Sequence, residues 1–202
     1  MTSSKNISDG DLSLSIEALK RKVLDAAVRG ELTEQLAEDG TAKDLLMQIS
    51  DEKRRLVAEG KIKKEKALPA ISDEEIPFEI PENWEWVRLG NISNFGTNIS
   101  VDPNAIGNDE WLLELEDIEK ETGNILTRKK KSECNPQSTK HKFRKGNVLY
   151  SKMRPYLNKV LVADDDGYCT SEIHVLDFGK YLESFVCRFF YLCLVSVRCK
   201  CL

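Results

Sequence analysis

The apolar pattern of this 202-residue chain changes at residues 67–83, a segment that contains Pro69, Pro77 and Pro81. Before this segment, apolar residues recur every three or four positions, which is the period of an amphipathic helix. After it, short β-forming runs alternate with turn residues. Each proline restricts the residue before it to extended backbone, so the segment itself is expected to be stretched. The sequence therefore predicts an α+β fold, in which an N-terminal helical arm precedes a mainly β domain with few short helices.

Residues 1–66 are expected to form the helical arm, with helices at about 11–29 and 42–59 and a charged linker after them. Thr41 and Asp44 have capping-box spacing, in which the hydroxyl accepts from the Asp44 amide while the carboxylate reaches back. A single helix with a narrow apolar stripe is unstable by itself in water. The two stripes therefore pack either as an ordinary helical hairpin within the domain or against a partner, as a docking or dimerisation arm.

Residues 84–178 are expected to form the β domain. Its predicted strands cover residues 86–89, 111–115, 125–128, 147–152, 159–162 and 170–178. Ile118 and Glu119 are also compatible with a short helix. The run from Asp164 to Gly167, which contains three consecutive acids, is interpreted as a solvated hairpin turn because Asp and Gly favour tight turns.

Residues 179–202 differ in composition from the rest, because four of the six cysteines fall within the last sixteen residues. A zinc site is disfavoured, since the tail has Cys199 and Cys201 one residue apart but no Cys-x2-Cys pair. The alternatives are a buried strand or helix, or a segment foreign to the domain, such as one read out of frame. The sequence shows no secretory signal and no apolar run of membrane-spanning length. We therefore expect a cytoplasmic protein with reduced thiols.

Positive charge is concentrated between Thr127 and Val160. Eleven Lys or Arg residues stand there against the single acid Glu133, although the whole chain has a net charge of −4. A basic cluster within an acidic protein indicates a contact surface for the phosphate backbone of a nucleic acid. The candidate DNA-binding residues are Arg128, Lys129, Lys130, Lys131, Lys142, Arg144, Lys145, Tyr150, Lys152, Arg154, Tyr156 and Lys159.

The sequence from Arg154 to Tyr156 is the most specific part of this segment. It lies between two predicted strands, and Pro155 fixes the backbone directly after the arginine. An arginine held at a hairpin tip can reach a guanine edge with two hydrogen bonds or grip a phosphate. We expect Arg154 and Lys152 to lie nearest the bases, with Tyr150 and Tyr156 stacking or donating to phosphate. The remaining cations are expected to contact phosphates.

No catalytic constellation is apparent. The chain lacks a glycine-rich phosphate loop, a nucleophile elbow and a His-Glu-x-x-His motif. His141 is interpreted as a phosphate donor or an exposed residue, and His174 as a solvent-facing or hydrogen-bonded strand residue. Three adjacent acids do not supply the separated ligands of a metal-dependent nuclease, which is the weakest alternative. We therefore expect a non-catalytic protein without a metal or cofactor.

Three blocks of sequence carry a family resemblance. They are the helical segments 19–32, 42–46 and 52–64, the segment 80–90 with its two tryptophans, and the segments 146–160 and 169–176. Together the blocks span roughly residues 16–178. The chain resembles the specificity (S) subunit of a type I restriction-modification enzyme, and residues 84–178 resemble its target recognition domain.

This resemblance implies a subunit that recognises double-stranded DNA and directs partner methyltransferase (modification) subunits and a restriction subunit. A complete family member has two recognition domains separated by long helices, whereas this chain has one and is about half the expected length. The resemblance therefore implies a truncated S subunit with an incomplete recognition domain, for which a second S-type chain is a candidate partner. The alternative is an interaction fragment that docks on methyltransferase subunits without binding DNA.

Overall fold

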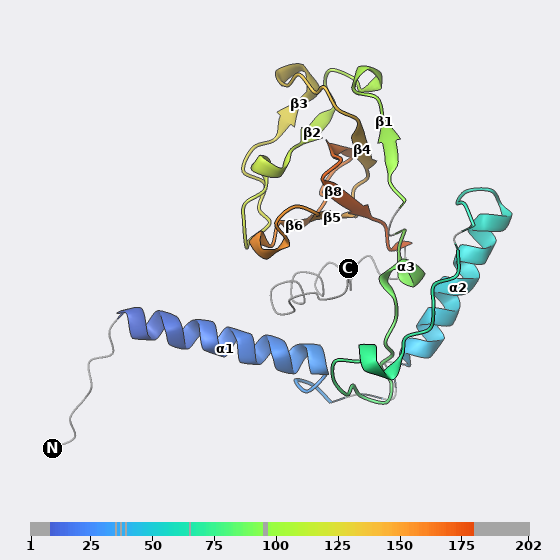
Figure 1. Cartoon of the computed structure of the whole chain (residues 1–202), viewed down its shortest axis with the longest axis vertical. Helices are drawn as coiled ribbons and strands as arrows, with labels where there is room; N and C mark the ends of the chain where they lie inside the picture. Colours follow the sequence, from blue (N-terminus) through green and yellow to red (C-terminus); the bar gives the residue numbers. More distant parts are fainter. Residues whose placement is uncertain are drawn as a thin grey trace.

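The computed structural model describes residues 9–34, 36, 38, 40–64, 66–94 and 97–179. Within these residues, two long helices precede eight short strands. Figure 1 shows the strands gathered into one body, while the first helix extends away from it. The predicted α+β class is confirmed. The cysteine-rich tail expected over 179–202 lies outside the described residues, except for Gly179.

Helix α1 (Asp9–Arg29) is held to the rest of the chain at its C-terminal end. Gly30 follows the helix with a φ of +75°, and a Cβ at this glycine would lie 2.7 Å from the Pro81 ring. The Arg29 guanidinium lies over the Phe78 ring, 4.7 Å from its centroid. The proline-containing segment therefore packs against the end of α1.

The apolar stripe of α1 is uncovered where its side chains are described. Ile16, Leu19 and Val23 share one helix face by their spacing, and all three are exposed. Figure 1 shows α1 and α2 apart from each other, on different sides of the connecting segment. The two helices therefore do not form the ordinary helical hairpin that the sequence left open.

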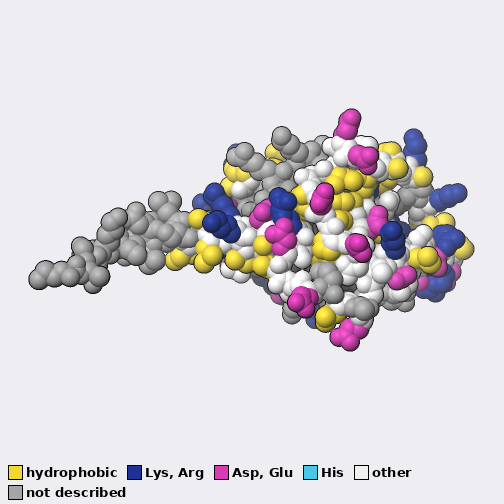
Figure 2. Space-filling model, turned by 90° about the horizontal axis from the view of Figure 1, so that it is seen from below, with side chains coloured by type: hydrophobic (Ala, Val, Ile, Leu, Met, Phe, Trp, Pro, Cys, Tyr) yellow, Lys and Arg dark blue, Asp and Glu magenta, His cyan; other side chains and the backbone are white. Residues whose placement is uncertain are grey.

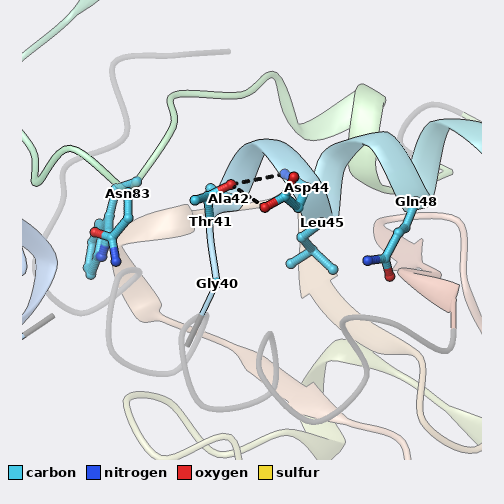
Figure 3. Close-up of a pocket in the computed structure, with 8 residues that line it drawn as sticks. Gly40, Thr41, Ala42, Asp44, Leu45, Gln48 and Asn83 are labelled. Atoms are coloured by element: carbon cyan, nitrogen blue, oxygen red, sulfur yellow. Dashed lines mark hydrogen bonds between the residues drawn. The ribbon is translucent and has the colours of Figure 1, made fainter. Parts of the chain in front are cut away.

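Helix α2 (Ala42–Ala58) begins at a capped N-terminus. Thr41 Oγ1 accepts a hydrogen bond from the Asp44 amide at 3.2 Å and donates one to the Asp44 carboxylate at 2.8 Å, as Figure 3 shows. The carboxylate thus binds the hydroxyl instead of the backbone amide expected of a capping box. The Ala42 amide donates to the Asn83 carbonyl at 2.9 Å, which joins the start of α2 to the segment that follows the prolines.

Lys53 joins α2 to the four-residue helix α3 (Leu89–Ile92). Its ammonium donates to the carbonyls of Gly90 and Ser93, both at 2.8 Å. The last carbonyls of a helix have no partner within the helix, so this lysine satisfies groups that would otherwise need water.

The strand predicted over residues 86–89 is wrong, because α3 begins at Leu89 and no described strand pairs with the residues before it. Instead, the Arg88 side chain holds this segment by donating to the carbonyls of Pro69 and Ala70, at 2.8 and 3.1 Å.

The β domain contains two sheets. The five-stranded sheet has the order β1 (Ile99–Val101), β4 (Lys140–Phe143), β7 (Gly167–Thr170), β2 (Trp111–Leu113) and β3 (Lys129–Lys130). Its strands are antiparallel except for the parallel pair of β2 and β7. The three-stranded sheet has the order β6 (Val160–Val162), β5 (Val148–Ser151) and β8 (Ile173–Leu176), with both pairs antiparallel.

Alternate residues of β5 face two different hydrophobic clusters, as a strand with both faces covered requires. Leu149 belongs to the cluster between the two sheets, where Trp111 and Phe143 meet edge to face at 5.1 Å. Val148 and Tyr150 belong to the second cluster, which also contains Ile49 of α2. Because β5 lies in the middle of its sheet and contributes to both clusters, the element that leaves its end is rigidly supported.

The strands predicted over 111–115, 147–152 and 159–162 are confirmed. The predicted hairpin between the last two is confirmed as well, because β5 pairs with β6. The strand predicted over 170–178 is confirmed as the shorter β8 (Ile173–Leu176), while residue 170 ends β7 and a turn joins the two strands. The strand predicted over 125–128 is wrong, because Ile125 makes an isolated bridge with Ile118 and β3 begins at Lys129.

Other local predictions also fail. The expected short helix near Ile118 is a single 3-10 turn at Leu115–Asp117. The acidic run that begins at Asp164 is not a hairpin turn, because it connects β6 and β7, which belong to different sheets. Strands β1 and β4 were not predicted, since the polar residues in them mask the alternating pattern.

We expect Lys53→Met to lower the free energy of unfolding by about 2 kcal/mol, because two half-buried carbonyls lose their charged donor. Lys43→Met is the matched control on the same helix. Among the described residues, the one ion pair of Lys43 is with Glu85, at 3.9 Å, and its substitution is expected to change stability by less than about 0.5 kcal/mol. Urea unfolding measures both values, and equal effects would contradict the role given to Lys53.

Candidate nucleic-acid interface

The structure does not bring the twelve candidate DNA-binding residues together on one surface. They fall into four groups: Arg128 to Lys131 around β3, Lys142 to Lys145 at the end of β4, Tyr150 in the interior, and Lys152 to Lys159 beyond the end of β5. Because β5 runs from Val148 to Ser151, the second and fourth groups lie at its opposite ends. The positive charge that is concentrated between residues 127 and 160 of the sequence is therefore spread over separate parts of the β domain.

Arg128 is occupied by an aromatic ring and a carboxylate. Its guanidinium lies over the Trp111 ring, 3.9 Å from the ring centroid. It donates to both carboxylate oxygens of Asp164, at 2.5 and 2.6 Å, and lies 3.7 Å from the Asp165 carboxylate. The acidic run interpreted as a solvated turn is thus the partner of a cation predicted to contact DNA.

Lys129 is held by two carboxylates. Its ammonium lies 2.7 Å from Asp117, whose side chain is 2% exposed, and 2.8 Å from Glu116. Hydrogen bonds to Asp117 and then to Glu116 raise the pKa of Lys129 well above its usual value. The same ion pair lowers the pKa of Glu116. Lys129 therefore neutralises a buried carboxylate and is part of the fold.

Lys130 and Lys131 also have partners within the chain. The Lys130 ammonium lies 2.9 Å from the Asp109 carboxylate, and hydrogen bonding to this acid raises the pKa of Lys130. The Lys131 ammonium lies 3.5 Å from the Asn108 side-chain oxygen. The face drawn in Figure 2 shows the same intermixing, since Lys and Arg are interspersed with Asp and Glu there.

Arg144 and Lys145 are exposed in the turn between β4 and β5. Within the described residues, their side chains make no ion pair or hydrogen bond. Lys142 precedes them on β4, with its ammonium 5.9 Å from the centroid of the Tyr168 ring. These three cations remain available for an anion, at the end of β5 that lies away from Arg154.

Tyr150, predicted to stack on a base or donate to a phosphate, is not presented to solvent in this structure. Tyr150 is 9% exposed and packs in the second cluster with Val148, Val160 and Leu176. Strand alternation puts it on the covered face of the three-stranded sheet. A strand residue with an aromatic ring is typical of a core as well as of a stacking platform, and sequence alone does not distinguish them.

Lys152 and Lys159 support the hairpin instead of facing outward. The Lys152 ammonium donates to the Ser171 carbonyl at 2.8 Å, and the Lys159 ammonium donates to the Leu115 carbonyl at 2.6 Å. Each lysine thus ties one end of the β5–β6 connection to a neighbouring loop. The expectation that Lys152 lies nearest the bases is not supported by this geometry.

Residues 153–158, which we call the hairpin tip, have an unusual backbone. Arg154 has φ and ψ of 51° and 61°, and Asn158 has 47° and 43°, so both are left-handed. The 3-10 turn Pro155–Leu157 lies between them. Left-handed residues other than glycine are uncommon, and bulky ones persist only where the surroundings impose them. Strain of this kind is concentrated at functional sites.

The side chains of the hairpin tip are presented to solvent. Tyr156 is 70% exposed and Met153 is 51% exposed, and Arg154 is exposed between them. Within the described residues, the Arg154 guanidinium has no hydrogen bond or ion pair. The hairpin tip thus combines an unpaired arginine and an exposed aromatic ring on a fixed backbone.

The chain offers little for catalysis within its described part. No group of three or more His, Cys, Asp or Glu residues there is placed to hold a metal ion. The His141 ring nitrogen Nδ1 lies 3.1 Å from the Ile173 carbonyl between the sheets, so His141 is a buried structural residue and not the exposed or phosphate-binding one expected. Burial raises the pKa of the Cys169 thiol to about 12, which keeps it protonated and unreactive. No described helix has the length and apolar character needed to cross a membrane.

The chain is thus an α+β protein in which helix α1 projects from a two-sheet domain, and this domain exposes Arg154 at the hairpin tip. No protein-family model matches the chain. Among curated proteins, it is 58% identical over 81 residues to the type I restriction enzyme EcoAI specificity subunit and 53% identical over 78 residues to the EcoEI specificity subunit, both from Escherichia coli. These matches cover 40% and 39% of this chain. The resemblance to type I restriction enzyme specificity subunits is confirmed.

Other comparisons are with the same class of protein. The Escherichia coli EcoDI specificity subunit is 32% identical over 114 residues, or 55% of this chain. The matched regions span 14%, 13% and 24% of the EcoAI, EcoEI and EcoDI subunits. The HsdS subunit from Thermoanaerobacter tengcongensis aligns with a TM-score of 0.43 and 22% identity, over 50% of this chain and 27% of that one. A chain from a structure of the type I R-M system aligns with a TM-score of 0.47 and 21% identity, over 57% of this chain and 31% of that one.

The contacts of Lys129 lead to a test that separates structural from DNA-binding roles. We expect Lys129→Met to lower the midpoint of urea unfolding, because it leaves the buried Asp117 carboxylate without its cation. Lys130→Met is the matched control, since Asp109 is fully solvated and an exposed pair contributes little. An unfolding midpoint that shifts equally in both variants would show that Lys129 is not structural.

Proposed function

We propose that this chain recognises specific DNA sequences as the specificity subunit of a type I restriction-modification complex and directs methyltransferase and restriction subunits to them. The similarity to specificity subunits supports the class of function. The observation that carries the proposal is Arg154, which is exposed on a fixed, left-handed backbone and has no hydrogen bond or ion pair of its guanidinium to any described residue. The proposal assigns no reaction to the chain itself.

The hairpin tip has the chemistry needed to recognise a base edge. A guanidinium donates in parallel to two acceptors, and guanine presents two acceptors in the major groove. Fixing the backbone of Arg154 before binding lowers the conformational entropy lost on contact. Tyr156, which is exposed beside it, can stack on a base or donate to a phosphate. The hairpin tip is therefore suited to enter a groove, while Arg144 and Lys145 can contact phosphate at a separate place.

The electrostatics of the proposed complex are weaker than the sequence indicates. Of the ten cations among the candidate residues, Lys142, Arg144, Lys145 and Arg154 make no ion pair and donate no side-chain hydrogen bond within the described residues. Each phosphate contact contributes about −0.9 to the slope of log affinity against log salt. Four contacts give a slope no steeper than about −4, whereas ten would give about −9.

We expect the full chain to bind a duplex enriched from a randomised library, with a salt slope between about −2 and −4. Arg154→Ala is expected to weaken this binding by about 1–3 kcal/mol if the arginine contacts a guanine. Lys130→Ala, whose cation is already paired with Asp109, is the control and is expected to leave affinity nearly unchanged. Fluorescence anisotropy across salt concentrations measures all three. A flat salt response, or equal losses in the two variants, would contradict the proposal.

A second candidate function is favoured by the uncovered stripe of α1. A helix that exposes Ile16, Leu19 and Val23 on one face is typical of a docking element. In this account the chain binds methyltransferase subunits, or a second S-type chain, without binding DNA. Retention by a modification subunit together with no retention by any duplex would select this second function over the first.

A further inference from the structure

The non-glycine residues with positive φ in the described chain meet at one place. They are Glu121, Arg154 and Asn158, with φ of 66°, 51° and 47°. Two lie in the hairpin tip, and the third lies in residues 119–124, which we call the bracing turn. Since such residues are rare, we infer that the contact between the two segments imposes all three left-handed backbone conformations.

The bracing turn contacts the hairpin tip through both backbone and side chain. The Glu121 amide donates to the Leu157 carbonyl at 3.0 Å. The Asn158 side-chain amide donates to the Glu121 carboxylate at 2.8 Å. Glu121 therefore holds two successive residues at the end of the hairpin tip, and its own left-handed backbone is what turns its amide and its carboxylate toward them.

Inside the hairpin tip, further hydrogen bonds carry this constraint to Arg154. The Leu157 amide donates to the Arg154 carbonyl at 2.9 Å, and the Asn158 amide donates to the Pro155 carbonyl at 3.1 Å. On the other side, Ser151 Oγ donates to the Met153 carbonyl at 2.7 Å. The backbone of Arg154 is thus fixed from both directions, while its side chain makes no hydrogen bond or ion pair in the part of the chain that the structure describes.

The bracing turn is itself rigid. The Glu119 carboxylate accepts hydrogen bonds from the Thr122 hydroxyl and from the Asn124 side-chain amide, and these bonds lower the pKa of Glu119. The Glu119 amide donates to the Asn124 carbonyl at 2.8 Å, and the Gly123 amide donates to the Glu119 carbonyl at 3.1 Å. A rigid turn can transmit a fixed position to the element it contacts, whereas a mobile one cannot.

We propose that Glu121 and Asn158 are positioning residues that set the orientation of Arg154 and thereby determine which base pair the hairpin tip discriminates. This inference rests on the proposed function, because it needs the hairpin tip to contact DNA. It goes further by assigning a part in specificity to residues that act through the backbone of the hairpin tip. Substitution at Glu121 or Asn158 would then alter sequence preference without altering any cation.

The donor and the acceptor of the Asn158–Glu121 hydrogen bond can be exchanged by substitution. Asn158→Asp keeps a short side chain that tolerates the left-handed region, but places a carboxylate against the Glu121 carboxylate. Glu121→Gln in the same chain supplies a side-chain amide that donates to the new aspartate. The double variant therefore restores one hydrogen bond with donor and acceptor exchanged. If Asn158→Asp lost base discrimination only through general damage to the structure, adding Glu121→Gln would not be expected to restore that discrimination.

The experiment uses the full chain and the duplex enriched from a randomised library. Arg154→Ala first identifies the base pair at which discrimination depends on the arginine. We expect Asn158→Asp to lose about tenfold in discrimination at that same base pair, with an unchanged salt slope because no phosphate contact is removed. We expect the double variant, Glu121→Gln with Asn158→Asp, to recover most of this loss.

Four results would overturn the inference. A folded Asn158→Asp variant with full discrimination would leave the proposed function standing and remove the positioning role. Discrimination that is lost but not rescued would show a general structural effect. A wild-type chain that enriches no duplex would overturn the inference together with the proposed function. Asn158→Gly, which allows positive φ without the amide, serves as a second variant if Asn158→Asp does not fold; retained discrimination in it would also contradict the positioning role.

Discussion

The pairing of β5 with both β6 and β8 is the constraint on which the rest of the structure depends. Leu149 on one face and Tyr150 on the other join two hydrophobic clusters, so β5 cannot shift without disrupting both. The hairpin tip is the direct continuation of this strand. Its backbone is strained, and strain persists only where the surrounding structure is firm enough to impose it.

Acidic side chains from other parts of the chain neutralise much of the basic segment. Asp164 holds Arg128, and the buried Asp117 holds Lys129. These acids come from outside the cationic stretch, so a count of charge along the sequence overstates the field at the surface. Among the described residues, a small number of cations remain without an ion pair, and one of them is an arginine on a fixed backbone. Recognition by this chain would therefore depend on positioning more than on bulk attraction, in keeping with the rule that phosphate contacts position and base contacts specify.

The sequence predicted those features that depend on local patterns. The α1 and α2 helices, the β5–β6 hairpin and the location of Arg154 at its tip follow from periodicity, glycine and proline positions. Features that depend on residues distant in sequence were not predictable. Nothing near Lys129 indicates Asp117 as its partner, and nothing in Glu121 signals a left-handed backbone that meets Asn158. The only local hint of the bracing turn was the Gly123-Asn124 pair, which marks a turn but not its contact.

We expect DNA to meet the hairpin tip and not the basic residues around β3. Photocrosslinking of the full chain to its enriched duplex, with a benzoylphenylalanine in place of either Tyr156 or Lys130, measures this directly. We expect a crosslink from position 156 that unlabelled duplex of the same sequence competes away, and little or none from position 130. A crosslink from position 130 with none from position 156 would contradict the account.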